Sequence, residues 1–415
     1  MPAKGGYKWD FDSPPEIEPH TLVKHELLKD YLIQYFRAIT VQPQIESVRI
    51  VLVDAFAGGG VYTRWDDKRR YEGSPLIMMR AVRQAEEEIN KSRKKPLKIK
   101  PKFYFIEESD EGFRCLSRML RESDIPYQGD ISLRQGDFQQ IYMSLIHEIA
   151  QLKTSKVLFI LDQYGYKNVP MTVIYNIFSA FPSPEVILTF AVDSLIDYLS
   201  PNNQRAVENI GLSKHIPSGD ELRTLKTARD YRQIIQKKII QGIYQESGAS
   251  FYTPFLIGST SSSRAYWLCH LAKHYRARDV MMEHHWNNPG RFSHYGSPGM
   301  HMFSYDPKND PLVTGQLAFE FDGAAQEVSL AQLADDLPRH IYDDVGQNGI
   351  IFSELLGKKF NDTPATIAMI RDSFELSLRD QDIQIIGKNG EMRRKAKAMK
   401  LDDIILPHPQ LRLKF

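Results

Sequence analysis

Apolar and polar positions follow two different periodicities in the N-terminal half of the chain. Over residues 20–39, apolar side chains recur three and four positions apart behind Pro19, which predicts an amphipathic helix. Residues 48–56 instead form a continuous and largely β-branched apolar run, which is typical of a strand buried on both faces. Because the two patterns alternate along the chain, we expect an α/β domain here.

The alternation of strand and helix patterns repeats five times before it breaks. Strands are predicted over residues 48–56, 102–108, 131–138, 156–166 and 185–192, and helices over residues 73–89, 111–123, 139–152 and 169–181. This order predicts a doubly wound, mostly parallel sheet. A polar helical stretch at 219–247 follows, and strand candidates at 250–260 and 264–274 are expected to close the sheet as a hairpin.

The C-terminal part reverses this order and places helices before strands. Short helices are predicted over residues 329–337 and 349–360, and a longer capped helix over residues 363–381. Two strand candidates then flank Asn389-Gly390, a dipeptide that strongly favours a hairpin turn. Helices followed by such a hairpin resemble a small α+β winged helix-turn-helix.

Length and composition indicate a folded protein of about two domains. The chain has 415 residues, 42% hydrophobic and 25% charged, and a formal net charge of +1. This balance gives no whole-molecule argument for nucleic-acid or membrane binding. The two cysteines, Cys115 and Cys269, exclude a disulfide framework and a thiolate zinc site. With no apolar signal core and no membrane-length apolar segment, we expect a cytoplasmic protein.

An acidic residue stands at the end of each of the first four predicted strands. These residues are Asp54, Glu107, Asp137 and Asp162. The carboxyl ends of parallel strands meet at one edge of the sheet, where ligands bind. Four carboxylates repel a phosphate, so we expect a ligand that is cationic or rich in hydroxyls and amines. Each acid also has a purely structural interpretation as the cap of the next helix.

S-adenosyl-L-methionine fits these requirements, since it carries a sulfonium, an ammonium, a ribose diol and an adenine but no phosphate. We expect Glu107 to accept the ribose hydroxyls, Asp137 to accept the adenine amine and Phe138 to cover the adenine ring. Gly58 and Gly60 then let the backbone approach the amino-acid part of the ligand. A dinucleotide-binding turn is the alternative, but the third glycine of its fingerprint is missing.

The spacing Asp54-x-Phe56-x-Gly58-x-Gly60 resembles the first motif of class I methyltransferases. Over roughly residues 8–290 the chain is similar to the three-Cys-motif partner (TcmP) family, on the segments "PHTLVKHELLKDYL", "VDAFAGGGVY", "EGSP", "FIEE" and "LDQYG". The resemblance implies a Rossmann-like methyltransferase fold of prokaryotes and their phages, linked to mobile elements or phage defence, with a partner protein encoded nearby. It leaves the substrate open.

The expected domains follow from these assignments. A methyltransferase-like domain is expected over residues 1–300, with a helical insertion at about 201–248. Residues 301–325 are expected to be a linker and residues 326–415 the winged helix-turn-helix domain.

The catalytic candidates are Asp162, Gln163 and Tyr164, which stand where amino-methyltransferases carry Asp/Asn-Pro-Pro-Tyr. In that chemistry a side-chain oxygen and a backbone carbonyl hold an aromatic amine in line with the methyl group. Asp162 and the carbonyl of Gln163 are expected to act in this way. The sequence departs from the pattern because Gln163 replaces a proline and Tyr164 places the aromatic ring third, so Tyr164 or Tyr166 must stack on an extruded base.

Two basic clusters are candidates for contact with nucleic acid. Residues 91–102 hold seven cations and no acid, in the long connection between the first two strands. The second cluster, Arg393, Arg394, Lys395 and Lys397, lies on the predicted wing, beside a candidate recognition helix that carries Thr363, Thr366, Arg371 and Arg379. The acids of that helix weaken its interpretation as a groove reader. Solvated loops and protein contacts are the alternatives.

No metal is expected, although His284, His285, His294 and His301 lie close in sequence, because their spacing is not that of a ligand set. The main functional hypothesis is an S-adenosyl-L-methionine-dependent methyltransferase that modifies DNA or RNA. A non-catalytic cofactor-binding or nucleotide-binding partner protein is one alternative. An enzyme of the same fold that uses an adenine nucleotide for another reaction is a second one.

Overall fold

The computed structural model describes residues 7–125, 130–164, 166–202, 204–228, 230–257, 266–288, 293–294, 299–301, 319–320 and 323–409. The chain forms two compact units, residues 1–284 and 285–415. The predicted linker falls mainly outside the described residues, so the predicted domain boundaries stay a prediction. No helix of the described part has the length and apolarity needed to cross a membrane.

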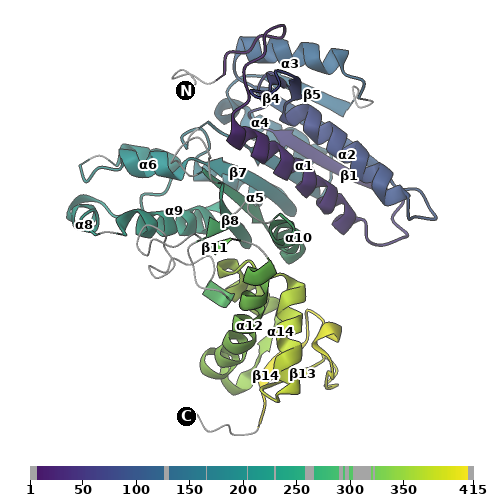
Figure 1. Ribbon diagram of the computed structural model, residues 1–415, viewed down its shortest axis with the longest axis vertical. Coiled ribbons are helices and arrows are strands. Elements are labelled where there is room, and N and C mark those ends of the chain that lie inside the picture. The colour runs from purple at the N-terminus through teal and green to yellow at the C-terminus, as the bar shows by residue number, and fades with distance from the viewer. Residues whose placement is uncertain are drawn as a thin grey trace. The chain divides into compact units, whose positions relative to one another are not determined.

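The first unit is built on a twisted sheet to which it contributes seven strands (Figure 1). They are β1 (Ser47–Asp54), β4 (Lys98–Glu107), β5 (Ile131–Gln135), β6 (Lys156–Leu161), β7 (Ser183–Phe190), β8 (Phe251–Ile257) and β9 (Tyr266–Ala272). Their order is β8-β9-β7-β6-β1-β4-β5. The pairs from β7 to β5 are parallel, and β9 runs antiparallel to both β7 and β8.

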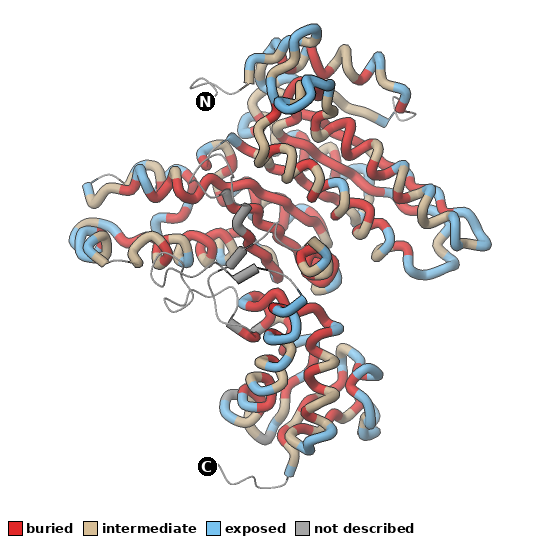
Figure 2. Tube along the Cα trace, viewed as in Figure 1, coloured by how far each residue is buried: buried red, intermediate tan, exposed pale blue. Residues whose placement is uncertain are grey.

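This topology confirms the predicted fold class, a doubly wound and mostly parallel sheet like that of Rossmann-type methyltransferases. The chain starts in the middle at β1, moves outward through β4 and β5, and returns to β6 on the other side of β1. Such a reversal creates a switch point at the carboxyl end of β1. The central residues of β1 are buried, which explains their continuous apolar pattern (Figure 2).

Helices flank this sheet. They are α1 (Pro19–Ile39), α2 (Ser74–Asn90), α3 (Asp110–Glu122), α4 (Phe138–Gln151), α5 (Met171–Ala180), α6 (Val192–Tyr198), α7 (Arg205–Ile210), α8 (Gly219–Leu225), α9 (Tyr231–Ser247) and α10 (Tyr275–Trp286). Helix α1 packs beside α2, and α5 packs beside α4 and α9. Pro19 begins α1 at a position where its missing N–H costs nothing. The first turns of α1 lie at the edge of the sheet where β1 and β6 end.

Three local features differ from the sequence-based expectation. Strand β4 begins at Lys98 rather than at residue 102, because Ile99 and Pro101 already face inward between exposed lysines. The polar helical stretch at 219–247 is two helices, α8 and α9. A hairpin of β2 (Val61–Thr63) and β3 (Arg70–Glu72) follows the glycines and was not predicted, since three-residue strands are too short to show a period.

The second unit carries the helices and the three-stranded sheet of a winged helix. Its elements are β10 (Ser293–His294), η2 (Gly299–His301), β11 (Phe319–Glu320), α12 (Gly323–His340), η4 (Ile341–Val345), η5 (Gly346–Asn348), β12 (Ile350–Ile351), α13 (Phe352–Lys359), η6 (Phe360–Asp362), α14 (Ile367–Arg379), β13 (Ile383–Ile386), η7 (Ala396–Ala398) and β14 (Ile404–Pro407). Strands β12, β14 and β13 pair antiparallel in that order. The predicted turn at Asn389-Gly390 follows the end of β13, and Gly390 has a φ of +84°.

Candidate functional site

A cavity of about 640 Å³ opens at the carboxyl ends of β1, β4 and β6 in the first unit. We call it the edge cavity. Its walls include most of the residues that the sequence suggested, namely Phe56, Gly58, Glu107, Phe138, Asp162, Gln163 and Tyr164. Asp54, Gly60 and Asp137 are not among the described residues that line it. Most of the suggested residues thus lie together at one edge of the sheet, and their roles as a site stay a prediction.

Asp54 lies beneath the edge cavity rather than in its wall. Its side chain is fully buried, and one carboxylate oxygen accepts a hydrogen bond from the backbone N–H of Phe56 at 3.2 Å. Burial raises the pKa of Asp54 to about 7. Asp54 thus fixes the start of the turn that follows β1, and it does so with a carboxyl group that is close to its titration point at neutral pH.

The glycine turn, residues 58–60, is covered by an aromatic ring of the protein itself. Gly58 and Gly60 adopt φ values of +62° and +74°. A Cβ placed on Gly58 or Gly59 would meet the indole ring of Trp9 at 2.6 or 2.5 Å. Trp9 is therefore the close neighbour of Gly58 and Gly59, while a Cβ on Gly60 would instead meet Leu116 at 2.7 Å. Trp9 also forms part of the cavity wall.

Glu107 connects the end of β4 to the glycine turn. One oxygen accepts from the N–H of Gly58 at 2.9 Å, and the other accepts from the N–H and the hydroxyl of Ser109 at 2.9 and 2.7 Å. A carboxylate offers about four lone-pair positions, so these three bonds leave acceptor capacity on the cavity side. Glu107 can therefore hold the turn and still accept a hydroxyl of a ligand.

Phe138 and Asp137 lie where β5 passes into α4. Asp137 caps this helix, since its carboxylate accepts from the N–H of Gln139 at 2.9 Å. Phe138 is buried and meets Phe56 edge to face, with 5.9 Å between the ring centroids. The two phenyl rings give the edge cavity an apolar face beside the carboxylate of Glu107.

Asp162 is bound by Lys24, the most consequential contact that sequence reasoning missed. The ammonium of Lys24 donates to both carboxylate oxygens, at 2.6 and 2.7 Å. Burial alone raises the pKa of Asp162, but the charge and hydrogen bonds of Lys24 and the hydroxyl of Thr189 outweigh it and lower that pKa. Asp162 is therefore an anion at the cavity wall.

Gln163 and Tyr164 differ sharply in exposure. The side chain of Gln163 is buried, and its carbonyl oxygen accepts from the backbone N–H groups of Asn168 and Val169 at 2.9 and 3.1 Å. Within the described part of the chain, the side-chain N–H₂ of Gln163 has no hydrogen-bond partner. Tyr164 is 64% exposed at the cavity rim. The residue thus offers a free ring face, as a stacking role requires.

An N-terminal strap, residues 7–18, forms one wall of the edge cavity. Tyr7 and Trp9 lie against Tyr62 on the β2–β3 hairpin, with ring centroids 5.2 and 5.1 Å from that of Tyr62. The strap also pairs with the hairpin, where Ile17 N–H donates to Thr63 and Thr63 N–H donates to Pro15, both at 2.9 Å. No periodic pattern marks this segment, so its role has no signal in the sequence.

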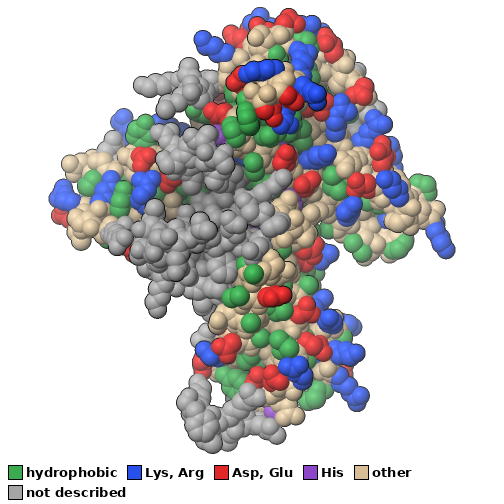
Figure 3. All heavy atoms as spheres, in the orientation of Figure 1, with side chains coloured by type: hydrophobic (Ala, Val, Ile, Leu, Met, Phe, Trp, Pro, Cys, Tyr) green, Lys and Arg blue, Asp and Glu red, His purple; other side chains and the backbone are tan. Residues whose placement is uncertain are grey.

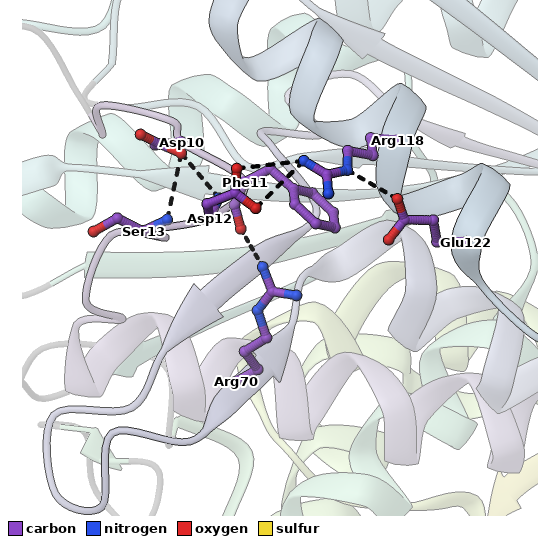
Figure 4. Close-up of polar contacts among 7 residues, drawn as sticks. All are labelled: Asp10, Phe11, Asp12, Ser13, Arg70, Arg118 and Glu122. Atoms are coloured by element: carbon purple, nitrogen blue, oxygen red, sulfur yellow. Dashed lines mark hydrogen bonds and ion pairs between the residues drawn. The ribbon is translucent and has the colours of Figure 1, made fainter.

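Figure 4 shows how the tip of the strap is fastened. The ring of Phe11 lies between two guanidinium groups. Its centroid is 3.7 Å from the guanidinium carbon of Arg118 and 4.6 Å from that of Arg70. Arg70 also donates to the carbonyl of Phe11, and Arg118 pairs with Asp12 at 3.4 Å. These contacts are mostly exposed and polar, so each contributes little to holding the tip of the strap. The indole of Trp9, in contrast, packs closely on the glycine turn.

The basic stretch at 91–102 is mostly exposed, and three of its seven cations bind to other parts of the first unit. Arg93 donates to the backbone carbonyls of Thr40 and Pro43, each at 2.8 Å. Lys95 pairs with Glu46 at 2.8 Å, and Lys98 pairs with Glu86 at 3.1 Å. Figure 3 shows acidic and basic side chains interspersed over the face in view. The contact of this stretch with nucleic acid stays a prediction.

In the wing cluster, Arg393 is held by a buried carboxylate, whereas Arg394, Lys395 and Lys397 are exposed. Arg393 donates to both oxygens of the buried Asp403 at 2.8 and 3.0 Å, and Lys397 pairs with Asp372 at 3.4 Å. Arg394 and Lys395 are exposed. They form no ion pair with any residue that the structure describes.

The candidate recognition helix α14 is less available than its sequence suggested. Thr366 caps the helix by accepting from the N–H of Met369 at 3.1 Å, and Thr363 is buried and donates to the carbonyl of Gly299. Arg371 donates to the carbonyl of Met399. Of the four suggested contact residues, Arg379 is the exposed one.

The histidine-rich segment is partly inside the fold. His284 and His285 are buried near the end of α10. Among the residues that the structure describes, no three His, Cys, Asp or Glu side chains form a group able to hold a metal ion. The side chains of His294 and His301 lie outside the described part.

Comparison with known proteins identifies the C-terminal module. Residues 304–390 match the family model described as a GMT-like wHTH domain. No curated protein matches the chain. Among solved structures, the chain is similar to LPL1258 from Legionella pneumophila, with 11% identity, a TM-score of 0.35, and coverage of 62% of this chain and 85% of that one.

Two further similar structures are methyltransferase-related or contain S-adenosylhomocysteine (SAH). The N-terminal domain of EvdMO1 with SAH bound has 10% identity, a TM-score of 0.30, and coverage of 59% of this chain and 79% of that one. The plantazolicin methyltransferase BamL in complex with a triazolic desmethylPZN analog and SAH has 7% identity, a TM-score of 0.27, and coverage of 60% and 86%.

Proposed function

We propose that the protein is an S-adenosyl-L-methionine-dependent methyltransferase that acts on nucleic acid, with an exocyclic amine of a base as the acceptor. One observation carries the proposal. The edge cavity has a carboxyl group with spare acceptor capacity, Glu107, beside an apolar face. It also has the carboxylate of Asp162, whose pKa is lowered, on the side where β6 ends. The first suits a nucleoside cofactor and the second suits an amine acceptor.

The cofactor fit rests on the residues between β1 and β5. A volume of about 640 Å³ is within the usual range for small-molecule sites. Glu107 accepts from ribose hydroxyls, and Phe56 and Phe138 contact the adenine. Asp54 and Asp137 act from behind, by fixing the turn after β1 and the start of α4. When bound, the cofactor supplies an electrophilic methyl group on its sulfonium.

The acceptor side is built from Asp162, Gln163 and Tyr164. Lys24 keeps Asp162 ionised, so its oxygens remain acceptors for the hydrogens of an amine. The backbone carbonyl of Gln163 provides the second acceptor, and together they orient the nitrogen lone pair. The exposed ring of Tyr164 stacks on a base that has left its helix.

The winged helix in the second unit supports nucleic acid as the substrate class, through Arg394 and Lys395. The resemblance of the first unit to the three-Cys-motif partner family supports a prokaryotic mobile-element or phage-defence setting, with a partner protein encoded nearby.

Calorimetric titration with S-adenosyl-L-methionine and S-adenosylhomocysteine tests the cofactor assignment. Glu107→Gln removes a charged acceptor and is expected to weaken binding about ten-fold. Glu111→Gln is the matched control, since Glu111 is exposed in the first turn of α3. Absence of binding to the unaltered protein, or equal affinity in the two variants, contradicts the assignment.

A non-catalytic cofactor-binding partner is the second candidate, and one observation favours it: Lys24 already donates to both oxygens of Asp162. Transfer of a labelled methyl group to DNA or RNA separates the two functions. Transfer that is lost in Asp162→Asn, while cofactor affinity persists, supports the enzyme. Cofactor binding without transfer to either nucleic acid supports the partner.

A further inference from the structure

A second hollow of about 620 Å³ lies beside the edge cavity in the first unit. We call it the side hollow. The loop after β6 separates the two, because Gln163, Tyr164 and Asn168 line the edge cavity while Tyr166, Lys167 and Pro170 line the side hollow. Within this loop, the carbonyl of Lys167 accepts from the side chain of Gln139 at 3.3 Å. The loop that carries the acceptor residues therefore borders the edge cavity on one side and the side hollow on the other.

The side hollow has a chemistry unlike that of the edge cavity. The described residues that line it include two cations, Lys167 and Arg205, and no carboxylate. The edge cavity is instead lined by one lysine, Lys24, and four acidic residues, Glu18, Glu107, Glu108 and Asp162. Its charge therefore favours an anion such as a phosphate. The amide side chains of Gln139 and Asn209 add hydrogen-bonding groups to the wall.

Aromatic rings complete the side hollow. Tyr198 ends α6 and is 73% exposed, which is the largest exposure among the exposed large apolar side chains of the described chain. Tyr166 is buried below, and the ammonium of Lys167 lies 5.8 Å from the centroid of its ring. An exposed ring next to two cations offers stacking and phosphate contacts on one surface.

We propose that the side hollow binds a single strand of nucleic acid next to the nucleotide whose base enters the edge cavity. Lys167 and Arg205 contact a phosphate, and Tyr198 stacks on the adjoining base. This inference rests on the proposed function for its link to methyl transfer, but strand binding itself does not. The exposed ring of Tyr198 favours a ligand that carries a base, because the base can stack on the ring. An isolated phosphate would need only the two cations. It also gives the first unit its own contact with the substrate, independent of the wing.

Fluorescence anisotropy with a labelled, mixed-sequence single strand tests this surface in the full chain. Lys167→Ala and Arg205→Ala are each expected to weaken binding several-fold and to reduce the slope of log affinity against log salt by about 0.7 per lost phosphate contact. Tyr198→Ala is expected to weaken binding about ten-fold, with little change in the salt slope.

The chain offers a matched control for each type of change. Lys237→Ala removes an exposed lysine from α9, and Tyr175→Ala removes a tyrosine that is 55% exposed on α5; neither residue lines the side hollow. Both controls are expected to bind as the unaltered protein does. The inference is overturned if the three hollow variants bind like their controls, or if inorganic phosphate is the only ligand whose binding they weaken.

The outcome separates this inference from the proposed function. Loss of strand binding in the hollow variants of a protein that binds no S-adenosyl-L-methionine supports the side hollow and contradicts the methyltransferase. Cofactor binding together with unchanged strand binding in all three variants supports the methyltransferase and overturns the side hollow.

Discussion

Lys24 on α1 and Asp162 at the end of β6 are 138 positions apart in sequence, and the ammonium of Lys24 lies 2.6 and 2.7 Å from the two carboxylate oxygens of Asp162. The side chains are only 12% and 27% exposed. The first helix is therefore part of the site as well as a cover for the sheet. The pair also determines how the acceptor side responds to mutation and pH.

Replacement of Lys24 by Met is expected to destabilise the fold by about 2 kcal/mol, because it leaves the Asp162 carboxylate partly buried and unpaired. The pKa of Asp162 then rises, since the charge and hydrogen bonds of Lys24 no longer oppose the effect of burial. Urea unfolding at pH 7 measures the loss. Lys29→Met is the control, because Lys29 is an exposed lysine of the same helix.

A double variant tests whether the effect belongs to the pair. Lys24→Met with Asp162→Asn is expected to be more stable than the sum of the two single changes, since no buried charge remains. Additive losses contradict the pairing. In the unaltered protein the lowered pKa of Asp162 stabilises the fold above the ordinary aspartate range, and this contribution is lost as pH falls through the folded-state pKa.

Asp54 predicts a pH dependence of the opposite sign. Burial raises its pKa from 3.8 to about 7, so between these values the folded chain keeps a proton that the unfolded chain has lost. The free energy of unfolding therefore falls as pH rises through this window and levels off above it. Asp54→Asn cannot ionise, and it is expected to gain roughly 3 kcal/mol relative to the unaltered protein between pH 4 and pH 8.

Urea unfolding at several pH values measures that difference. Asp130→Asn, a change at an exposed residue, is expected to give a difference that is flat with pH. A flat difference for Asp54→Asn as well would show that Asp54 is ionised in the folded protein throughout.

The Trp9 indole on the glycine turn makes Gly59 intolerant of a side chain. A Cβ on Gly59 meets Trp9 at 2.5 Å and the sulfur of Cys115 at 3.1 Å, so Gly59→Ala is expected to cost about 1–3 kcal/mol. In the double variant with Trp9→Ala the added cost of Gly59→Ala should largely disappear. Gly357→Ala on α13 meets nothing within 4 Å and is expected to be neutral or stabilising. Thermal unfolding of the unaltered protein, the two single variants, the double variant and Gly357→Ala measures these costs. An equal cost of Gly59→Ala with and without Trp9 contradicts the contact.

The fold was predictable from the sequence because its signals are local. The apolar run at β1 needs no distant information to be interpreted as a buried strand, and the alternation with amphipathic helices determines the sheet type. The Asn389-Gly390 turn marked the wing for the same reason. Since parallel strands end at a common edge, the sequence alone is also enough to assign Glu107 and Asp162 to one site.

The remaining features of the site depend on contacts between distant segments. Nothing in the surroundings of Lys24 indicates that its partner is Asp162, and nothing in the N-terminal segment indicates that Trp9 covers the glycine turn. The glycines were interpreted as a close approach to a ligand, but a backbone that lacks Cβ atoms has the same sequence pattern whether a ligand or an indole approaches it.

The wing cations are expected to divide into two functional groups. Arg393 is the partner of the buried Asp403, whose pKa it lowers, so Arg393→Ala is expected to lower the thermal midpoint of the second unit. Arg394 and Lys395 are exposed, so the double change to Ala should leave that midpoint unaltered.

The same double change should weaken duplex DNA binding and reduce its salt slope by about 0.9 per lost phosphate contact. Anisotropy and calorimetry on both variants provide the measurement, with Lys237→Ala, a change at an exposed lysine of α9, as the control. A double variant that binds DNA with unchanged affinity and slope would remove the wing from the nucleic-acid contact and leave the first unit to make it.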